Sequence, residues 1–151
     1  QRYGFISGPM DSYNAVKRYE GFKKALKKHN ITQHALYHGD FTIDGGFKIG
    51  QQFKYEQNKP DFVFCANDET AIGFMQAIKE HHFSIPNDVS IAGFDNFYMT
   101  QFTQPKITTI GINHIEWGHQ VARKIIQLLD GQVLPKKESP QGEFFWRETC
   151  K

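Results

Sequence analysis

The sequence has few cysteines, no long apolar run and no strong excess of one charge. Its two cysteines, Cys65 and Cys150, are too few for a disulfide framework, which favours a reducing compartment. No apolar run approaches membrane-spanning length, and the N-terminus carries no signal-peptide pattern. The net charge of +2 is not gathered into one long basic block, so composition does not indicate direct binding to nucleic acid.

The common catalytic motifs are also missing. The chain has no glycine-rich phosphate loop and no Gly-x-Ser-x-Gly elbow, and its seven histidines lack metal-ligand spacing. Asp40, Asp68 and Asp95 could perform acid–base chemistry in a cleft, but no nucleophile or metal site is indicated beside them. We therefore expect a protein that is not an enzyme, with no catalytic residue, no metal site and no cofactor.

The stretch from Pro60 to Gly73 is the most informative part of the sequence. Residues 62–66 are continuously apolar, which is typical of a strand covered on both faces in a parallel sheet. Asn67 is a good helix N-cap, and Asp68 adds negative charge to a first helical turn. In α/β sheets, ligands bind beyond the carboxyl ends of the strands, where these two residues would lie. The alternative is that they only cap the helix and match its dipole.

The same alternation of strand and helix recurs along the chain. We expect strands at 3–7, 35–37, 62–66, 89–94 and 107–110, and helices at about 12–29, 44–57, 68–82 and 115–129. Residues 144–146 could add a last strand. This order predicts an α/β fold, with a parallel sheet between helical layers, and 151 residues are enough to bury its core.

Polar and aromatic residues follow several of the expected strands. The strand ends carry Gly8-Pro9, Asp40-Phe41, Asn67-Asp68 and Asp95-Asn96, and in a parallel sheet all of these lie at one edge. Carboxylate and amide oxygens accept hydroxyl protons, while an aromatic face covers apolar C–H groups. The edge is therefore suited to a neutral polyhydroxyl ligand.

Six segments, in order, resemble the effector-binding domain of the bacterial LacI/GalR transcription regulators. They are Phe5-Ile6-Ser7-Gly8-Pro9, residues 15–22 with Arg18 shortly before Gly21-Phe22, Gly39-Asp40-Phe41-Thr42, residues 66–73, residues 85–96 and Ile107-Thr108-Thr109-Ile110. The resemblance covers nearly the whole chain. It implies a lobe with the fold of periplasmic binding proteins, in a three-layer α/β/α arrangement, with a fragment of the second lobe.

The resemblance implies roles for six residues in ligand binding. Arg18 resembles the arginine that grips ligand hydroxyls, Phe41 the aromatic that packs on the ligand, and Asp95 the carboxylate that accepts from hydroxyls. Asn67 resembles a neighbouring polar wall. Ser12 and Asn14 match positions that contact effectors in some members. Structural alternatives are that Arg18 pairs with an aspartate (Asp68 or Asp95), that Phe41 belongs to the core and that Asn67 is only a cap.

The resemblance also divides the chain. Residues 1–110 would form the C-terminal lobe, residues 111–137 would belong to the incomplete N-terminal lobe, and residues 138–151 would return as a tail. After Thr108-Thr109 the family often has Val-Arg-Gln-Pro, where this chain has Ile110-Gly111-Ile112-Asn113. The helix at 115–129 lacks its expected sheet, so we expect it to pack on a partner chain or lie loosely. Gln1-Arg2 leads straight into a strand without a methionine, which suggests a longer parent protein.

The implied function is that of a sensor domain in a cytoplasmic repressor. A small effector, most simply a sugar or sugar derivative, would bind between two lobes and alter operator binding. The implied partners are the effector and a second copy of the chain. Operator DNA would be reached only through an N-terminal helix-turn-helix absent from this chain, and no membrane contact is implied. The alternatives are a sugar-binding receptor of a transport system and a small doubly wound hydrolase or isomerase.

Overall fold

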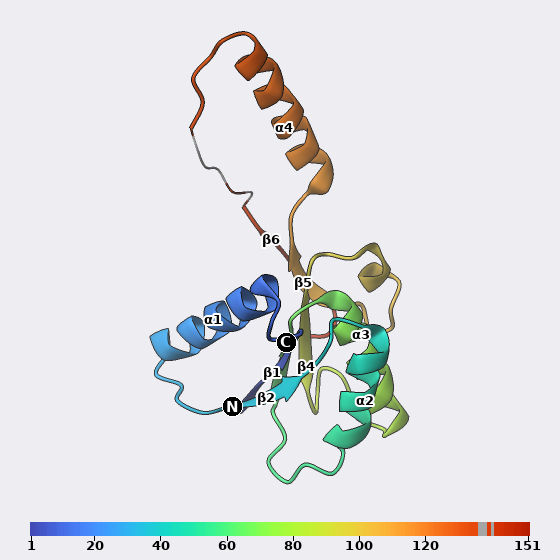
Figure 1. Ribbon diagram of the computed structural model, residues 1–151. Helices are drawn as coiled ribbons and strands as arrows, with labels where there is room; N and C mark the ends of the chain where they lie inside the picture. The colour runs from blue at the N-terminus through green and yellow to red at the C-terminus, as the bar shows by residue number, and fades with distance from the viewer. Residues whose placement is uncertain (136–138, 140) are drawn as a thin grey trace.

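A six-stranded sheet forms the centre of the computed structural model, which describes residues 1–135, 139 and 141–151 (Figure 1). The strand order is β2-β1-β3-β4-β5-β6. Strands β1 to β5 are parallel, and β6 is antiparallel to β5. The strands are β1 (Tyr3–Ser7), β2 (His34–His38), β3 (Phe62–Cys65), β4 (Ser90–Phe94), β5 (Thr108–Gly111) and β6 (Glu143–Phe145). The predicted α/β class and parallel sheet are confirmed.

Helices lie on both faces of this sheet. They are α1 (Tyr13–Lys28), α2 (Ile43–Phe53), α3 (Asp68–Glu80) and α4 (His114–Leu129), with a short 3-10 helix, η1 (Tyr98–Gln101). Helices α2 and α3 pack together over one face, and α1 lies on the other (Figure 1). Helix α4 extends away from the sheet.

The alternating side chains of the strands form two separate apolar clusters. On β1, Ile6 belongs to the larger cluster beneath α2 and α3, whereas its neighbour Phe5 packs against Phe22 of α1. On β3, Val63 faces the α2/α3 side, and Phe64 lies on the α1 side. The continuous apolar run at 62–66 therefore supplies both faces, as predicted for a central parallel strand. The α1 layer is a single helix, so part of that face stays open.

Glycines allow α2 and α3 to approach each other closely. A Cβ atom added at Gly46 would lie 2.2 Å from the carbonyl oxygen of Thr70, and one at Gly73 would lie 1.8 Å from that of Ile43. Helix α2 begins at Thr42, whose side chain accepts from the Gly45 amide. The pair Gly45-Gly46, a weak helix signal in sequence terms, is thus explained by packing, with Gly46 against α3 and Gly45 against the Asp40 carboxylate. The helix ends at Phe53 rather than near residue 57, since the chain then makes tight turns.

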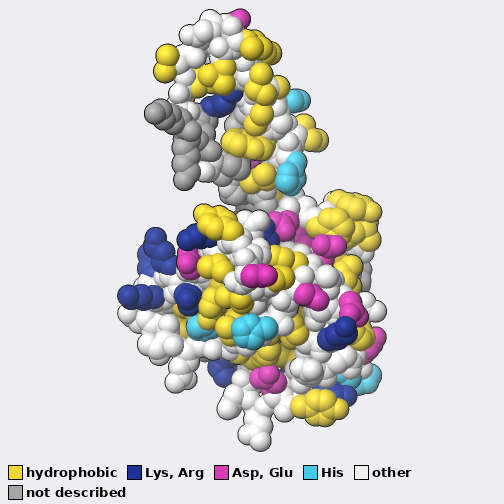
Figure 2. Space-filling model, in the orientation of Figure 1, with side chains coloured by type: hydrophobic (Ala, Val, Ile, Leu, Met, Phe, Trp, Pro, Cys, Tyr) yellow, Lys and Arg dark blue, Asp and Glu magenta, His cyan; other side chains and the backbone are white. Residues whose placement is uncertain are grey.

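Helix α4 has no buried residue, although its sequence is amphipathic. Its exposed apolar side chains, which Figure 2 shows along the protruding part of the molecule, are Ile115, Val121, Ile125, Ile126, Leu128 and Leu129. The chain then returns through β6 to the sheet. Its last residues contact β4, where the Thr149 hydroxyl donates to the Ile91 carbonyl at 2.6 Å. The expected last strand near residues 144–146 is present as β6.

Candidate functional site

The carboxyl ends of the parallel strands carry a polar cluster built around an arginine–aspartate pair. Arg18 lies in the second turn of α1, and its guanidinium donates to both carboxylate oxygens of Asp95, at 2.7 and 3.1 Å. The same guanidinium donates to the Ala66 carbonyl at 2.6 Å, just after β3. Its carbon atom lies 4.2 Å from the centroid of the Phe94 ring. Two other segments of the chain, at the ends of β3 and β4, therefore fix the planar guanidinium of this α1 residue.

Asp95 is held by this pair and is still accessible. The Asp95 side chain is 45% exposed, against 18% for that of Arg18. Its backbone has φ of +106°, a conformation that residues with a Cβ rarely adopt. Its amide donates to the Ile110 carbonyl at 2.7 Å. A strained backbone thus presents a half-open carboxylate beside a fixed guanidinium, which is a common feature of binding sites.

Phe41 forms an aromatic wall next to the pair. Its φ is +68°, and its ring centroid lies 5.7 Å from the Arg18 guanidinium carbon. A Cβ atom added at Gly8 would lie only 2.2 Å from the Phe41 ring, so the ring covers the turn after β1. Phe41 also packs against the small cluster under α1. The ring therefore serves both the core and the rim of the site.

Asn67 is buried, and its amide is already engaged. Its carbonyl oxygen accepts from the Thr70 amide at 3.1 Å as the N-cap of α3, and its Nδ2 donates to the Phe41 carbonyl at 2.8 Å. It is thus a cap, as the sequence allowed, and also holds the Phe41 turn in place. Asp68 is buried too, and burial raises the pKa of its carboxyl to about 6.

Ser12 and Asn14 lie at the start of α1. Ser12 is the N-cap residue by position, but its side chain makes no capping hydrogen bond. Asn14 is exposed and lines a hollow of about 490 Å³ together with Lys17, Arg18 and Phe94. Asn14 therefore shares a hollow with Arg18, whereas Ser12 lies just before the helix that carries Arg18.

Asp40 forms its hydrogen bonds with Thr42 and takes no part in the Arg18–Asp95 pair. Its Oδ1 accepts from the amide and hydroxyl of Thr42, and these hydrogen bonds lower the pKa of the Asp40 carboxyl. In the part of the chain that the structure describes, no three histidine, cysteine or acidic residues are grouped in a way that could hold a metal ion. The arrangement at the strand ends offers a carboxylate acceptor and guanidinium donors side by side.

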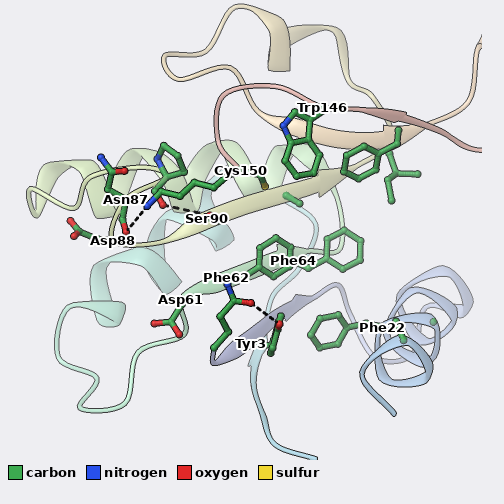
Figure 3. Close-up of a pocket in the computed structure, with 18 residues that line it drawn as sticks. Tyr3, Phe22, Asp61, Phe62, Phe64, Asn87, Asp88, Ser90, Trp146 and Cys150 are labelled. Atoms are coloured by element: carbon green, nitrogen blue, oxygen red, sulfur yellow. Dashed lines mark hydrogen bonds between the residues drawn. The ribbon is translucent and has the colours of Figure 1, made fainter. Parts of the chain in front are cut away.

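A larger hollow, of about 730 Å³, lies on the open part of the sheet's α1 face (Figure 3). In Figure 3, Phe22 of α1 and Trp146 of the returning chain lie on opposite sides of Phe64. The hollow adjoins the smaller one beside Arg18, since both are lined by Gly21, Phe22, Phe64 and Ile110. Its lining does not include Arg18 or Asp95. We place the candidate site at the strand ends, because a specific site needs converging polar groups.

One residue of this region had no signal in the sequence. Arg147 lies in the C-terminal segment, directly after residues 144–146, where the sequence predicted a possible last strand. Its guanidinium donates to the side-chain oxygens of Asn96 and Thr100 and to the Ile107 carbonyl, at 2.8–2.9 Å. It thereby ties the returning chain to the turn after β4, which carries Asp95. No motif surrounds Arg147, which is brought to this place by the antiparallel pairing of β6 and by hydrogen bonds of residues 147–149 to β4 and β5 and to Lys106.

The sequence matches the periplasmic binding protein-like domain family over residues 1–150. It is 32% identical over 135 residues to the NTD biosynthesis operon regulator NtdR of Bacillus subtilis, a match that covers 88% of this chain and 41% of that protein. It is 34% identical over 134 residues to the HTH-type transcriptional repressor CytR of Escherichia coli, covering 87% of this chain and 39% of that one. The chain thus spans about two fifths of the length of these relatives.

The fold matches solved structures of LacI-family regulators. A crystal structure of the lactose repressor bound to the anti-inducer ONPF superposes with a TM-score of 0.92 and 28% identity, covering 100% of this chain and 56% of that one. In the part of this chain that the structure describes, no helix is long and apolar enough to cross a membrane. The family resemblance expected from the sequence is confirmed. The chain belongs to the periplasmic binding protein-like domain family and corresponds to the C-terminal part of LacI-family regulators.

Proposed function

We propose that the chain is the effector-binding and dimerisation part of a LacI/GalR-type transcription regulator that senses a small sugar or sugar derivative. The observation that carries this proposal is the pairing of Arg18 with a half-exposed Asp95 at the strand ends. The relatives support it, since those compared above are a regulator and repressors of transcription.

The geometry of the pair suits neighbouring hydroxyl groups. A sugar hydroxyl can donate to an Asp95 oxygen while it accepts from an Arg18 N–H, and charge-assisted hydrogen bonds of this kind are the strong ones. The Phe41 ring, beside the same guanidinium, can cover the C–H face of the sugar. Ser12 and Asn14 would add contacts at the rim, and Asn67 would act through the Phe41 turn that it holds.

The proposed regulator is larger than this chain. Residues 1–110 would form one lobe, residues 111–137 would belong to the other, and residues 138–151 would return to the first. The exposed apolar face of α4 supports this division, because an amphipathic helix is stabilised by burying that face. Effector binding between the lobes would shift their closure and so change operator binding by a helix-turn-helix outside these 151 residues.

The remaining properties follow from the same proposal. The regulator would act as a homodimer in the cytoplasm, bind no membrane, need no cofactor or metal and have no enzymatic activity. The named relatives are transcriptional regulators, which supports these assignments. A transport receptor with the same fold would share the hydroxyl-binding edge but would have no effect on operator DNA.

The test is a thermal-shift panel of sugars, sugar phosphates and nucleobases with the native chain and with Asp95→Asn. A ligand at ten times its Kd adds about 1.4 kcal/mol to the free energy of unfolding. For a domain of this size that should raise the melting temperature by about 3–6 °C. Asp95→Asn should lose this shift, since affinity should fall at least tenfold when one charged partner is neutralised.

Asp61→Asn is the matched control. Asp61 is also a half-exposed aspartate paired with an arginine, Arg2, but it precedes β3 at the opposite edge of the sheet. The Asp61→Asn variant also shows how far concentrated sugar stabilises the fold in general, an effect that needs no binding site. A shift that persists in Asp95→Asn, or that vanishes equally in Asp61→Asn, would contradict binding at the Arg18–Asp95 pair.

A further inference from the structure

The buried carboxylate of Asp68 connects three elements of the sheet edge. Asp68 is the first residue of α3 and is 1% exposed. Its Oδ1 accepts from the Thr109 hydroxyl on β5, and its Oδ2 accepts from the Phe97 amide after β4, each at 2.6 Å. A Cβ atom at Gly93 would lie 2.0 Å from Oδ1, so β4 leaves room for the carboxylate.

A simple helix-capping role does not explain this placement. The side chain that caps α3 is Asn67, which accepts from the Thr70 amide. Within the described part of the chain, the hydrogen bonds that the Asp68 carboxylate accepts come from β5 and from the turn after β4, not from α3. A carboxylate that only matched the helix dipole would gain little from being buried, because burial is costly for a charge.

The turn that Asp68 contacts is residues 95–97, which presents the Asp95 carboxylate. Its first two residues have φ of +106° and +51°, so the surrounding contacts must hold it. The three backbone N–H groups donate in turn to the Ile110 carbonyl at 2.7 Å, to Thr109 Oγ1 at 3.3 Å and to Asp68 Oδ2 at 2.6 Å. Two of these depend on Asp68, because it also accepts the Thr109 proton and so orients that hydroxyl.

We propose that Asp68 is a positioning residue of the effector site, which with Thr109 holds the turn 95–97 in the conformation that aims Asp95 at Arg18. The part played by Asp95 in binding rests on the proposed function above. The role of Asp68 in fixing the turn 95–97 rests only on the hydrogen bonds and the backbone angles. The conformation of the turn can therefore be tested separately from ligand binding.

The surroundings of Asp68 provide a spectroscopic signal for this role. Burial raises the pKa of the Asp68 carboxyl to about 6, against the hydrogen bonds from Thr109 and Phe97 that lower it. Among charged groups, Asp95 raises the pKa of Asp68 and Arg147 lowers it, while the pKa of the neighbouring Cys65 thiol is raised by burial and by Asp68. The Phe97 amide donates to Oδ2 of this titrating carboxyl group. The chemical shift of the Phe97 amide proton should therefore change with a midpoint near pH 6.

The experiment is amide hydrogen exchange, read by NMR, on the 151-residue chain and two pairs of variants. Asp68→Ala removes the acceptor for the Phe97 amide, whereas Asp68→Asn keeps one. Thr109→Val removes the acceptor for the Asn96 amide, whereas Thr109→Ser keeps it. We expect these two amides to exchange at least about tenfold faster in the disruptive member of each pair and near the native rate in the conservative member.

Amides of the central strands, such as those of Val63 and Ile91, report global unfolding in the same samples. Faster exchange confined to residues 96–97 supports the proposal, as does a Phe97 titration near pH 6 that Asp68→Asn abolishes. Equal exchange at residues 96–97 in all four variants, or an increase no larger than at Val63 and Ile91, would overturn it. The measurement needs no sugar, so a failed thermal-shift panel leaves this result intact.

Discussion

At the scale of single residues, the site depends on side chains far apart in the sequence. Arg18 and Asp95 are 77 positions apart. The strand-end pattern and the family resemblance both pointed to Asp95, whereas the resemblance alone pointed to Arg18, and their role in ligand binding stays a prediction. The sequence left open whether Arg18 pairs with Asp68 or Asp95, and the structure shows Asp95. It could not reveal Arg147 or the Thr109 hydrogen bond, because neither lies in a pattern that periodicity or spacing detects.

Asp68 should make stability depend on pH. Its pKa rises from 3.8 to about 6 on burial, so the folded state binds the proton more tightly than the unfolded chain. The resulting stability is present below pH 4 and is lost as the pH rises through about 6, with a slope of up to about 1.4 kcal/mol per pH unit. Because carboxyls with a lowered pKa, such as Asp40, contribute the opposite slope to both proteins, urea unfolding should show that the native chain loses stability relative to Asp68→Asn as the pH rises across this range. Parallel profiles for the two proteins would contradict it.

Gly8 should tolerate no side chain, in contrast to Gly21. A Cβ atom at Gly8 would overlap the Phe41 ring, so Gly8→Ala should lower the free energy of unfolding by about 1–3 kcal/mol and displace the aromatic wall. Gly21 lies within α1 with nothing within 4 Å, so Gly21→Ala should raise that free energy by about 0.5–1 kcal/mol. Denaturant unfolding of both variants checks whether the free energy of unfolding changes in opposite directions. Equal changes in the two variants would show that the overlap with the Phe41 ring is relieved without cost.

At the scale of helices and strands, the sequence predicted the order of the elements better than the residues at which they begin and end. The continuous apolar runs of β3 and β4 and the helical spacing after Asn67 identified their elements correctly. The end of α2 was predicted too late, because tight turns after Phe53 carry no strong sequence signal. Gly45-Gly46 made the start of α2 uncertain, because Gly45 lies against the Asp40 carboxylate and Gly46 against α3, and a local pattern does not show these contacts.

Helix α4 should be weakly protected in the monomeric chain. None of its residues is buried, and helices of this length are marginal without tertiary packing. We expect its amides to exchange at least about a hundredfold faster than those of α3, which has eight buried residues. Exchange measured by mass spectrometry at low protein concentration checks this. Strong protection of α4 in a monomer would contradict both its packing on a partner and a loose placement.

At the scale of the whole molecule, five parallel strands bring distant strand ends to one edge, as the sequence predicted. The sequence did not predict the apolar hollow on the α1 face, because single strands do not show which part of a sheet lacks a helix. The matched repressor structure is nearly twice as long as this chain, which covers 56% of it. The division into lobes stays a prediction, supported by the exposed face of α4.

The most direct test of the proposed binding edge is NMR chemical-shift mapping of the 151-residue chain, titrated with the sugar that gives the largest thermal shift. The proposed function predicts the largest changes at the amides of Ser12, Phe41 and Asp95 and at the Arg18 side chain. Changes centred on Phe62, Phe144 and Trp146, which line the apolar hollow, with none at Arg18 or Asp95, would contradict it.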